Sequence, residues 1–135
     1  MNKVLSILSG KEVDESVIDQ GFVGNSQQTA GCFIKTQFVN SISEGVVLAT
    51  EKDPKTNTWT VTVEIDTEHW IRYCNLSATT SISGRNISQG SFIGYPYKGL
   101  MRLEYCNNDK SQFPVRINNR QLYKQDPTPV IFSED

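Results

Sequence analysis

The stretch from Trp59 to Ile65 constrains the fold most, because apolar and polar residues alternate along it without interruption. One face would carry Trp59, Val61, Val63 and Ile65, and the other Thr60, Thr62 and Glu64. Strict alternation is typical of a β-strand with one buried face and argues against an amphipathic helix. An apolar run at 46–49 and turn-forming residues at 53–57 precede it, so we predict a hairpin over residues 46–65.

Short strands and turns are predicted for most of the chain after residue 31. The expected strands are 32–38, 69–74 and 100–106, with a final hairpin of 115–117 and 121–123 that turns at Asn118 and Asn119. Ser, Thr, Asn and Gln number 42 against 28 charged residues, which favours strands and turns over helices. We therefore predict an all-β fold, a curved antiparallel sheet formed by a β domain at 32–123.

The two ends of the chain are expected to lie outside this sheet. Residues 1–31 are predicted to be an irregular or helical N-terminal segment, with two helical turns over 14–20. Residues 124–135 contain Pro127 and Pro129, which exclude a central strand, so we predict an extended C-terminal arm there.

Charge and hydropathy exclude several classes of partner. The chain has 13 Lys and Arg against 15 Asp and Glu, and its positive charges do not cluster along the sequence, so nucleic acid is not expected as a partner. No stretch approaches the roughly 20 apolar residues of a membrane-spanning helix, so no membrane is expected either. The apolar start at 1–8 is too short for a signal peptide, which predicts synthesis in a cytoplasm.

The three cysteines are expected to be buried, reduced thiols. Cys32, Cys74 and Cys106 cannot all pair within one chain, and their spacing does not match a zinc knuckle.

Five segments, taken in order, resemble a known architecture. They are 44–47 (EGVV), 63–66 (VEID), 70–77 (WIRYCNLS), 87–94 (ISQGSFIG) and 100–104 (LMRLE). This series resembles the lysostaphin-type zinc endopeptidases, which cut peptidoglycan cross-links and carry "DGxV", "YxHLS", "VxxGxxIG" and "HLHFE" in the same order on a β-sheet domain. The resemblance covers a little under half of the chain, and the "VxxGxxI" turn also occurs in biotinyl and lipoyl carrier domains. It implies a curved sheet of the peptidoglycan-endopeptidase type.

The same resemblance implies that the catalytic zinc site is missing. The family holds zinc with histidines and an aspartate and leaves one position open for water. The "YxHLS" histidine falls on Asn75, and the two histidines of "HLHFE" fall on Leu100 and Arg102. An upstream histidine near Ser26 is also absent, and the only histidine, His69, matches no ligand position. We therefore expect no enzyme activity, no bound metal and no cofactor.

The flanks at 18–25 and 123–130 resemble the ends of small structural proteins from tailed bacteriophages. This resemblance predicts a structural component of a phage tail or baseplate, located in the virion after synthesis in the host cytoplasm. Its partners would be other tail proteins, and a homo-oligomer is compatible with cyclic tail rings. The arm would dock on a neighbour through Lys124, Asp126, Pro127 and Pro129, so removing 124–135 is expected to weaken assembly without unfolding the domain.

Two other hypotheses remain open from the sequence. A peptidoglycan- or glycan-binding module would use Tyr95 and Tyr97, which flank Pro96, because aromatic rings pack against sugar faces. Trp59 and Trp70 are predicted to be core residues instead. An enzyme with different chemistry would use the carboxylates Glu64, Asp66 and Glu104, or His69 with Cys74 or Cys106.

Overall fold

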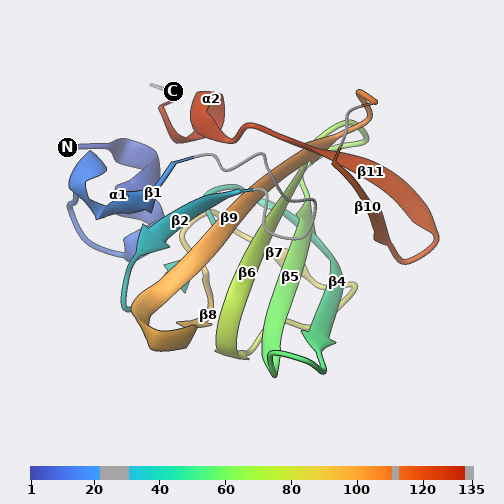
Figure 1. The fold of residues 1–135 in the computed structure, drawn as a ribbon, viewed down its shortest axis with the longest axis horizontal. Helices are drawn as coiled ribbons and strands as arrows, with labels where there is room; N and C mark the ends of the chain where they lie inside the picture. The colour runs from blue at the N-terminus through green and yellow to red at the C-terminus, as the bar shows by residue number, and fades with distance from the viewer. Residues whose placement is uncertain (22–30, 111–112, 133–135) are drawn as a thin grey trace.

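The computed structural model describes residues 1–21, 31–110 and 113–132, and its centre is a set of four long antiparallel strands. These are β4 (Gly45–Asp53), β5 (Thr58–Glu64), β6 (Trp70–Thr79) and β9 (Leu100–Asn107). Strands β4 and β5 form a hairpin with Val47 opposite Val63, which confirms the hairpin predicted over 46–65. Each of the four strands pairs with its neighbour, so this part of the sheet runs β9-β6-β5-β4 (Figure 1).

Shorter elements extend this centre on all sides. They are α1 (Lys3–Ser9), β1 (Ile18–Gln20), β2 (Cys32–Lys35), β3 (Val39–Asn40), β7 (Asn86–Ile87), β8 (Phe92–Pro96), β10 (Pro114–Ile117), β11 (Arg120–Gln125) and α2 (Thr128–Ile131). The described residues form one antiparallel sheet of 11 strands that does not close into a barrel. The all-β architecture predicted from the sequence is thus confirmed, and no helix among the described residues is long and apolar enough to cross a membrane.

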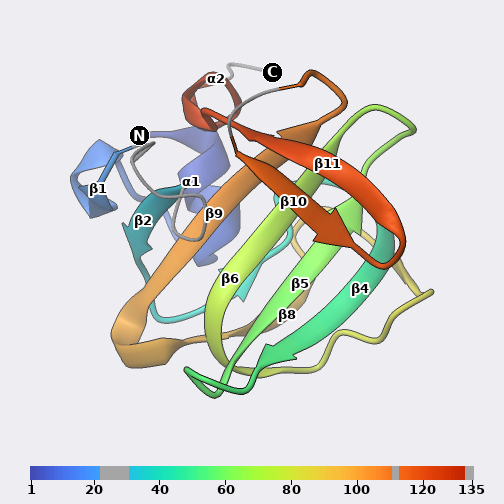
Figure 2. The same cartoon turned by 45° about the vertical axis from the view of Figure 1, so that its right-hand side comes forward.

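The sheet is covered on both faces. The larger core packs Leu5 and Leu8 of α1 and Ile131 of α2 against the face that carries Val61 and Val63. A smaller core on the other face contains Trp70 with Ile117 and Leu122 of the β10–β11 hairpin. Figure 2 shows this hairpin lying across β6, β5 and β4.

Both faces of β5 are covered, the second of them by the β10–β11 hairpin. Val61 and Val63 are fully buried, as the alternation predicted. Thr62 on the opposite face is also 0% exposed, although its type and position predicted contact with water. The β10–β11 hairpin closes over that face, so the prediction of a polar outer face was wrong at this residue.

The N-terminal segment is more regular than predicted. Helix α1 begins after Asn2, whose side chain accepts a hydrogen bond from the Leu5 N–H, and it ends at Gly10 with φ 75°. The two helical turns expected over 14–20 are wrong, because a 3-10 turn at Glu15–Val17 leads directly into β1. There, Ile18 pairs with Ile34 of β2.

The C-terminal segment is folded back onto the domain, and the predicted extended arm is wrong for its described part. Strand β11 runs to Gln125 and pairs with β9, which places Lys124 opposite Cys106. Helix α2 then puts Ile131 into the larger core at 1% exposure. Removing 124–135 would therefore take away core contacts, so we expect it to damage folding as well as any assembly.

Ile131→Ala tests this correction. The substitution removes a buried side chain from the larger core, so we expect a loss of about 2–4 kcal/mol in the free energy of unfolding. Chemical denaturation followed by circular dichroism measures it. The neighbouring Phe132→Ala is the control, because Phe132 is 49% exposed. Equal stability of the two variants would contradict the packing of Ile131 in the core and support the extended arm predicted from the sequence.

The cysteines match their prediction, since Cys32, Cys74 and Cys106 are all free and buried. Burial raises the pKa of the Cys32 thiol to about 11 and that of Cys106 to about 12. Only the thiolate reacts readily with disulfide reagents. We expect no fast reaction of the native protein with such a reagent at pH 8, and three thiols per chain after denaturation. A rapidly reacting thiol in the native protein would contradict this packing.

Candidate functional site

The three sequence positions that match the endopeptidase histidines lie together on neighbouring strands β6 and β9. Cys74 of β6 is opposite Arg102 of β9. The adjacent Asn75 has φ 65° and donates a hydrogen bond from Nδ2 to the carbonyl of Leu100 at 2.7 Å. The structure therefore brings Asn75, Leu100 and Arg102 to one place, and the fourth position, near Ser26, lies outside the described residues.

Two other residues from the resembling segments have structural roles. The hydroxyl of Tyr73 accepts a hydrogen bond from the Ile42 N–H at 2.9 Å and holds the chain between β3 and β4 against the core. Burial raises the pKa of this hydroxyl to about 12, so it remains protonated. Gly94 passes so close to β6 that a Cβ there would collide with the carbonyl oxygen of Ala78. Both residues therefore stabilise the sheet, and neither contact depends on a catalytic function.

A buried ion-pair cluster occupies the face next to these positions. Glu104 accepts hydrogen bonds from Arg72 Nη1 at 2.6 Å and from Arg102 Nε at 2.8 Å. Lys124 Nζ lies 3.1 Å from the same Glu104 oxygen that Arg102 contacts. The side chains are 0% exposed for Glu104, 4% for Lys124, 11% for Arg72 and 19% for Arg102. Three cations thus share one carboxylate in a place largely screened from water.

The charge states in this cluster follow from its geometry. Burial by itself would raise the pKa of Glu104, but the attraction of Arg72, Lys124 and Arg102 outweighs it and holds the pKa below its usual value. Burial, with a contribution from Glu104, raises the pKa of the Cys74 thiol. The cluster at neutral pH therefore consists of three cations, one carboxylate and a neutral thiol.

A groove of about 560 Å³ opens above the cluster, between the sheet and the β10–β11 hairpin. Arg72 and Arg102 line it from the sheet, and Lys124 and Arg116 from the hairpin. The positive charges, which do not cluster in the sequence, are thus brought together by the fold. Sequence reasoning missed Arg72 and Lys124 as members of this site. The sequence did contain a signal for Arg72. It lies two residues before Cys74 on a predicted strand, so the two side chains share one face of the sheet, and Cys74 is opposite Arg102.

The residues considered from the sequence for metal binding or catalysis do not form a common site among the described residues. Within the described ranges, no three His, Cys, Asp or Glu side chains come close enough to hold a metal ion. His69 pairs with Asp66 at 2.7 Å and stacks on Tyr105, while Glu64 lies 3.7 Å from Arg120. Each of the three carboxylates considered from the sequence therefore has its own partner. Cys74 is fully buried and its pKa is raised, the opposite of what a thiolate nucleophile needs.

The tyrosines predicted for glycan binding lie on the surface, at the end of β8. Tyr95 is 49% exposed and Tyr97 is 42% exposed. Phe92 and Phe38 pack against Tyr95, with ring centroids 5.0 Å and 5.8 Å away. Trp70, by contrast, is fully buried as predicted. Tyr95 therefore belongs to an aromatic cluster with the exposed Phe38 and the half-buried Phe92.

The four residues predicted to make a docking arm do not act together. Lys124 is buried in the ion-pair cluster, and Pro127 is buried as well. Asp126 is exposed and accepts a hydrogen bond from the Thr128 N–H at 2.9 Å, which caps the start of α2. Only Asp126 and Pro129 of the four remain available on the surface.

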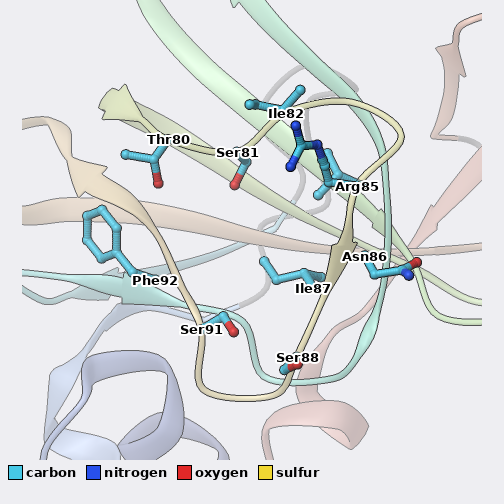
Figure 3. A pocket seen from close by; sticks show the side chains of 10 residues that line it. Thr80, Ser81, Ile82, Arg85, Asn86, Ile87, Ser88, Ser91 and Phe92 are labelled. Carbon is cyan, nitrogen blue, oxygen red and sulfur yellow. The ribbon is translucent and has the colours of Figure 1, made fainter.

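A second hollow, of about 330 Å³, lies among the loops around β7 (Figure 3). Its lining is mostly small and polar, with Ser81, Ser88 and Ser91 on three sides and the Arg85 side chain extending toward Ile82. It contains a single charged residue, Arg85. The hollow therefore offers far less charge than the groove under the hairpin.

Comparison with solved structures shows that the fold is of the lysostaphin type. Lysostaphin from Staphylococcus simulans is similar with a TM-score of 0.63 and 19% identity, over 84% of this chain and 48% of lysostaphin. LytU is similar with a TM-score of 0.62 and 16% identity, over 87% and 86% of the two chains. A chain of the SpoIIIAH–SpoIIQ complex gives 0.59 and 16%, over 87% and 95%.

These similarities establish the fold of the chain and not its function. Lysostaphin is described as an antimicrobial peptidase, and this chain spans about half of its length. No protein-family model matches the sequence, and comparison with curated proteins finds no relative. The chain thus has the fold of the peptidoglycan endopeptidases that its sequence resembled, at identities that establish the fold alone.

Proposed function

We propose that this chain is a non-catalytic domain with the lysostaphin-type fold, and that it acts through protein–protein contacts as a structural part of a phage tail or baseplate. The observation that carries the first part is the position of Arg102. It stands where the endopeptidase motif has a histidine, and its Nε is bonded to the buried carboxylate of Glu104. A cation held at that point repels a zinc ion, and Asn75 and Leu100 supply neither an imidazole nor a carboxylate.

Hydrolysis of peptidoglycan tests the absence of catalysis. Purified protein is incubated with cell-wall sacculi and added zinc, and released fragments are analysed by mass spectrometry. The proposal predicts no fragments above those of a heat-denatured sample. A double variant, Asn75→His with Arg102→His, is the informative comparison because it restores imidazoles at two of the motif positions. Cleavage by the unaltered protein would overturn the proposal.

The structural role is supported by the resemblance of the flanks to phage structural proteins and by the position of β10 at the end of one branch of the described sheet. Strand β10 is the last strand of that branch and pairs with β11, and the end of a sheet is where a strand of a partner protein adds. Addition of a partner strand needs no reactive centre. It suits contacts with other tail proteins or with further copies of this chain.

Quantitative mass spectrometry of purified virions from the source phage tests this role. A tail or baseplate component is expected at a fixed number of copies per particle, in multiples of the ring symmetry. Absence from clean particles would contradict the structural role and leave the fold unaffected.

A peptidoglycan- or glycan-binding module is the second candidate, favoured by the aromatic cluster in which Tyr95 and Phe38 are exposed and Phe92 is half-buried. Rings of this kind pack against sugar faces and against apolar protein surfaces. Saturable binding of muropeptides that is lost in Tyr95→Ala would favour the module. Tyr123→Ala is the matched control, because this tyrosine lies on the distant strand β11.

A further inference from the structure

The groove under the β10–β11 hairpin concentrates positive charge in a protein that is slightly acidic overall. Its lining includes six cationic side chains: Lys52, Lys55, Arg72, Arg102, Arg116 and Lys124. Against them stand Glu51 and Asp53 in the lining and Glu104 beneath it, which leaves an excess of three positive charges. The whole chain has a formal net charge of −2 at pH 7. The groove is therefore a positive region on a negative protein.

The arginines in this groove are held in place with donors to spare. Arg72 is fixed by Thr62 through Nε and by Glu104 through Nη1. Arg102 is fixed by Glu104 through Nε, and no described residue is hydrogen-bonded to its Nη1 or Nη2. A guanidinium fixed on one side presents its remaining N–H groups as a planar pair, the geometry that matches two oxygens of a phosphate or carboxylate.

The charge balance of the cluster also points to an anion. Arg102 and Lys124 contact the same oxygen of Glu104, at 2.8 Å and 3.1 Å, so their positive charges lie side by side. Buried charges are costly unless they are compensated, and here one carboxylate serves three cations. An oxyanion that enters the groove is attracted by this excess of positive charge.

We propose that this groove binds an oxyanion group, phosphate or carboxylate, of a ligand through Arg102, Lys124 and Arg116. Arg102 and Lys124 form the floor of the site, and Arg116, which is exposed on β10, forms its rim. This assignment rests on the proposed function in one respect: strands β6 and β9, which carry Arg72 and Arg102, must not hold a zinc ion.

Isothermal titration calorimetry with two probes tests the site, in Hepes buffer at low ionic strength. The probes are inorganic pyrophosphate and citrate. Saturable one-site binding of either supports the proposal, and the tighter probe tells whether the ligand group is phosphate or carboxylate. Loss of one charge-assisted contact in Arg102→Gln is expected to weaken binding at least about tenfold. Arg116→Gln, on the exposed rim, is expected to weaken it by a smaller factor without disturbing the fold.

Arg85→Gln is the matched control, because it removes an exposed arginine outside the groove and should leave binding unchanged. The inference is overturned if neither probe binds, or if Arg102→Gln and Arg116→Gln bind as the parent does. If Arg102→Gln fails to fold, Arg116→Gln decides alone. Zinc content of the same preparation separates the two proposals: a zinc-free protein that binds neither probe overturns this inference alone, whereas stoichiometric zinc overturns the proposed function.

Discussion

Glu104→Gln is expected to destabilise the domain by about 3–5 kcal/mol, because it leaves three largely buried cations without their counter-charge. The glutamine has the same shape, so lost charge and not lost volume causes the effect. Urea denaturation at neutral pH measures the change in the free energy of unfolding. Glu64→Gln is the control, since Glu64 is 27% exposed and lies 3.7 Å from the half-exposed Arg120. Similar stability of the two variants would contradict the cluster.

The same residue predicts the pH dependence of stability. The folded protein lowers the pKa of Glu104 from its ordinary value of 4.5. The unfolded chain therefore binds a proton first as the pH falls, and the stability due to Glu104 is complete above pH 4.5 and is lost below it, as the pH falls through the folded-state pKa. Denaturation between pH 7 and pH 3 should show this acid loss in the parent, and a shallower one in Glu104→Gln. Parallel curves would contradict the lowered pKa.

Val61→Asp is expected to abolish stable folding. Val61 is fully buried in the larger core, and an aspartate there places a charge where none of the core side chains can pair with it. The cost should reach about 4 kcal/mol or more, a large part of the stability of a domain of this size. Thermal unfolding followed by circular dichroism measures it.

Ile65→Asp is the control for this substitution. Ile65 follows β5 and belongs to the same alternating set, but its side chain is 37% exposed. We expect a loss of less than about 1 kcal/mol. If Val61→Asp and Ile65→Asp unfold at the same temperature, the buried face of β5 has been misassigned.

Local sequence signals predicted the central strands but not what covers them. The alternation from Trp59 to Ile65 located β5, because a period of two reports which face is buried. It did not report that Thr62 is buried too, since its cover comes from β10 and β11, more than fifty residues away. Helix α1 had signals that went unused, the cap at Asn2 and the glycine at Gly10. The apolar residues of this start were considered only as a signal peptide, for which they are too few.

The candidate site was half predictable. The resemblance placed Asn75, Leu100 and Arg102 at equivalent motif positions, and the pairing of β6 with β9 brings them together. Lys124 was expected on a surface arm, because Pro127 and Pro129 follow it closely. The strand instead continues to Gln125 before the prolines, and the pairing of β11 with β9 carries Lys124 inward. Contacts of that range depend on the whole fold and leave no local pattern.

The zinc content of the purified protein tests the central proposal most directly. The protein is incubated with excess zinc, dialysed, and analysed by inductively coupled plasma mass spectrometry alongside a known zinc endopeptidase of the same fold. A non-catalytic domain with Arg102 in the ion-pair cluster predicts far less than one zinc ion per chain, and no change in the thermal midpoint on adding zinc. One tightly held zinc ion per chain, with a raised midpoint, would contradict the proposal and restore the case for an enzyme.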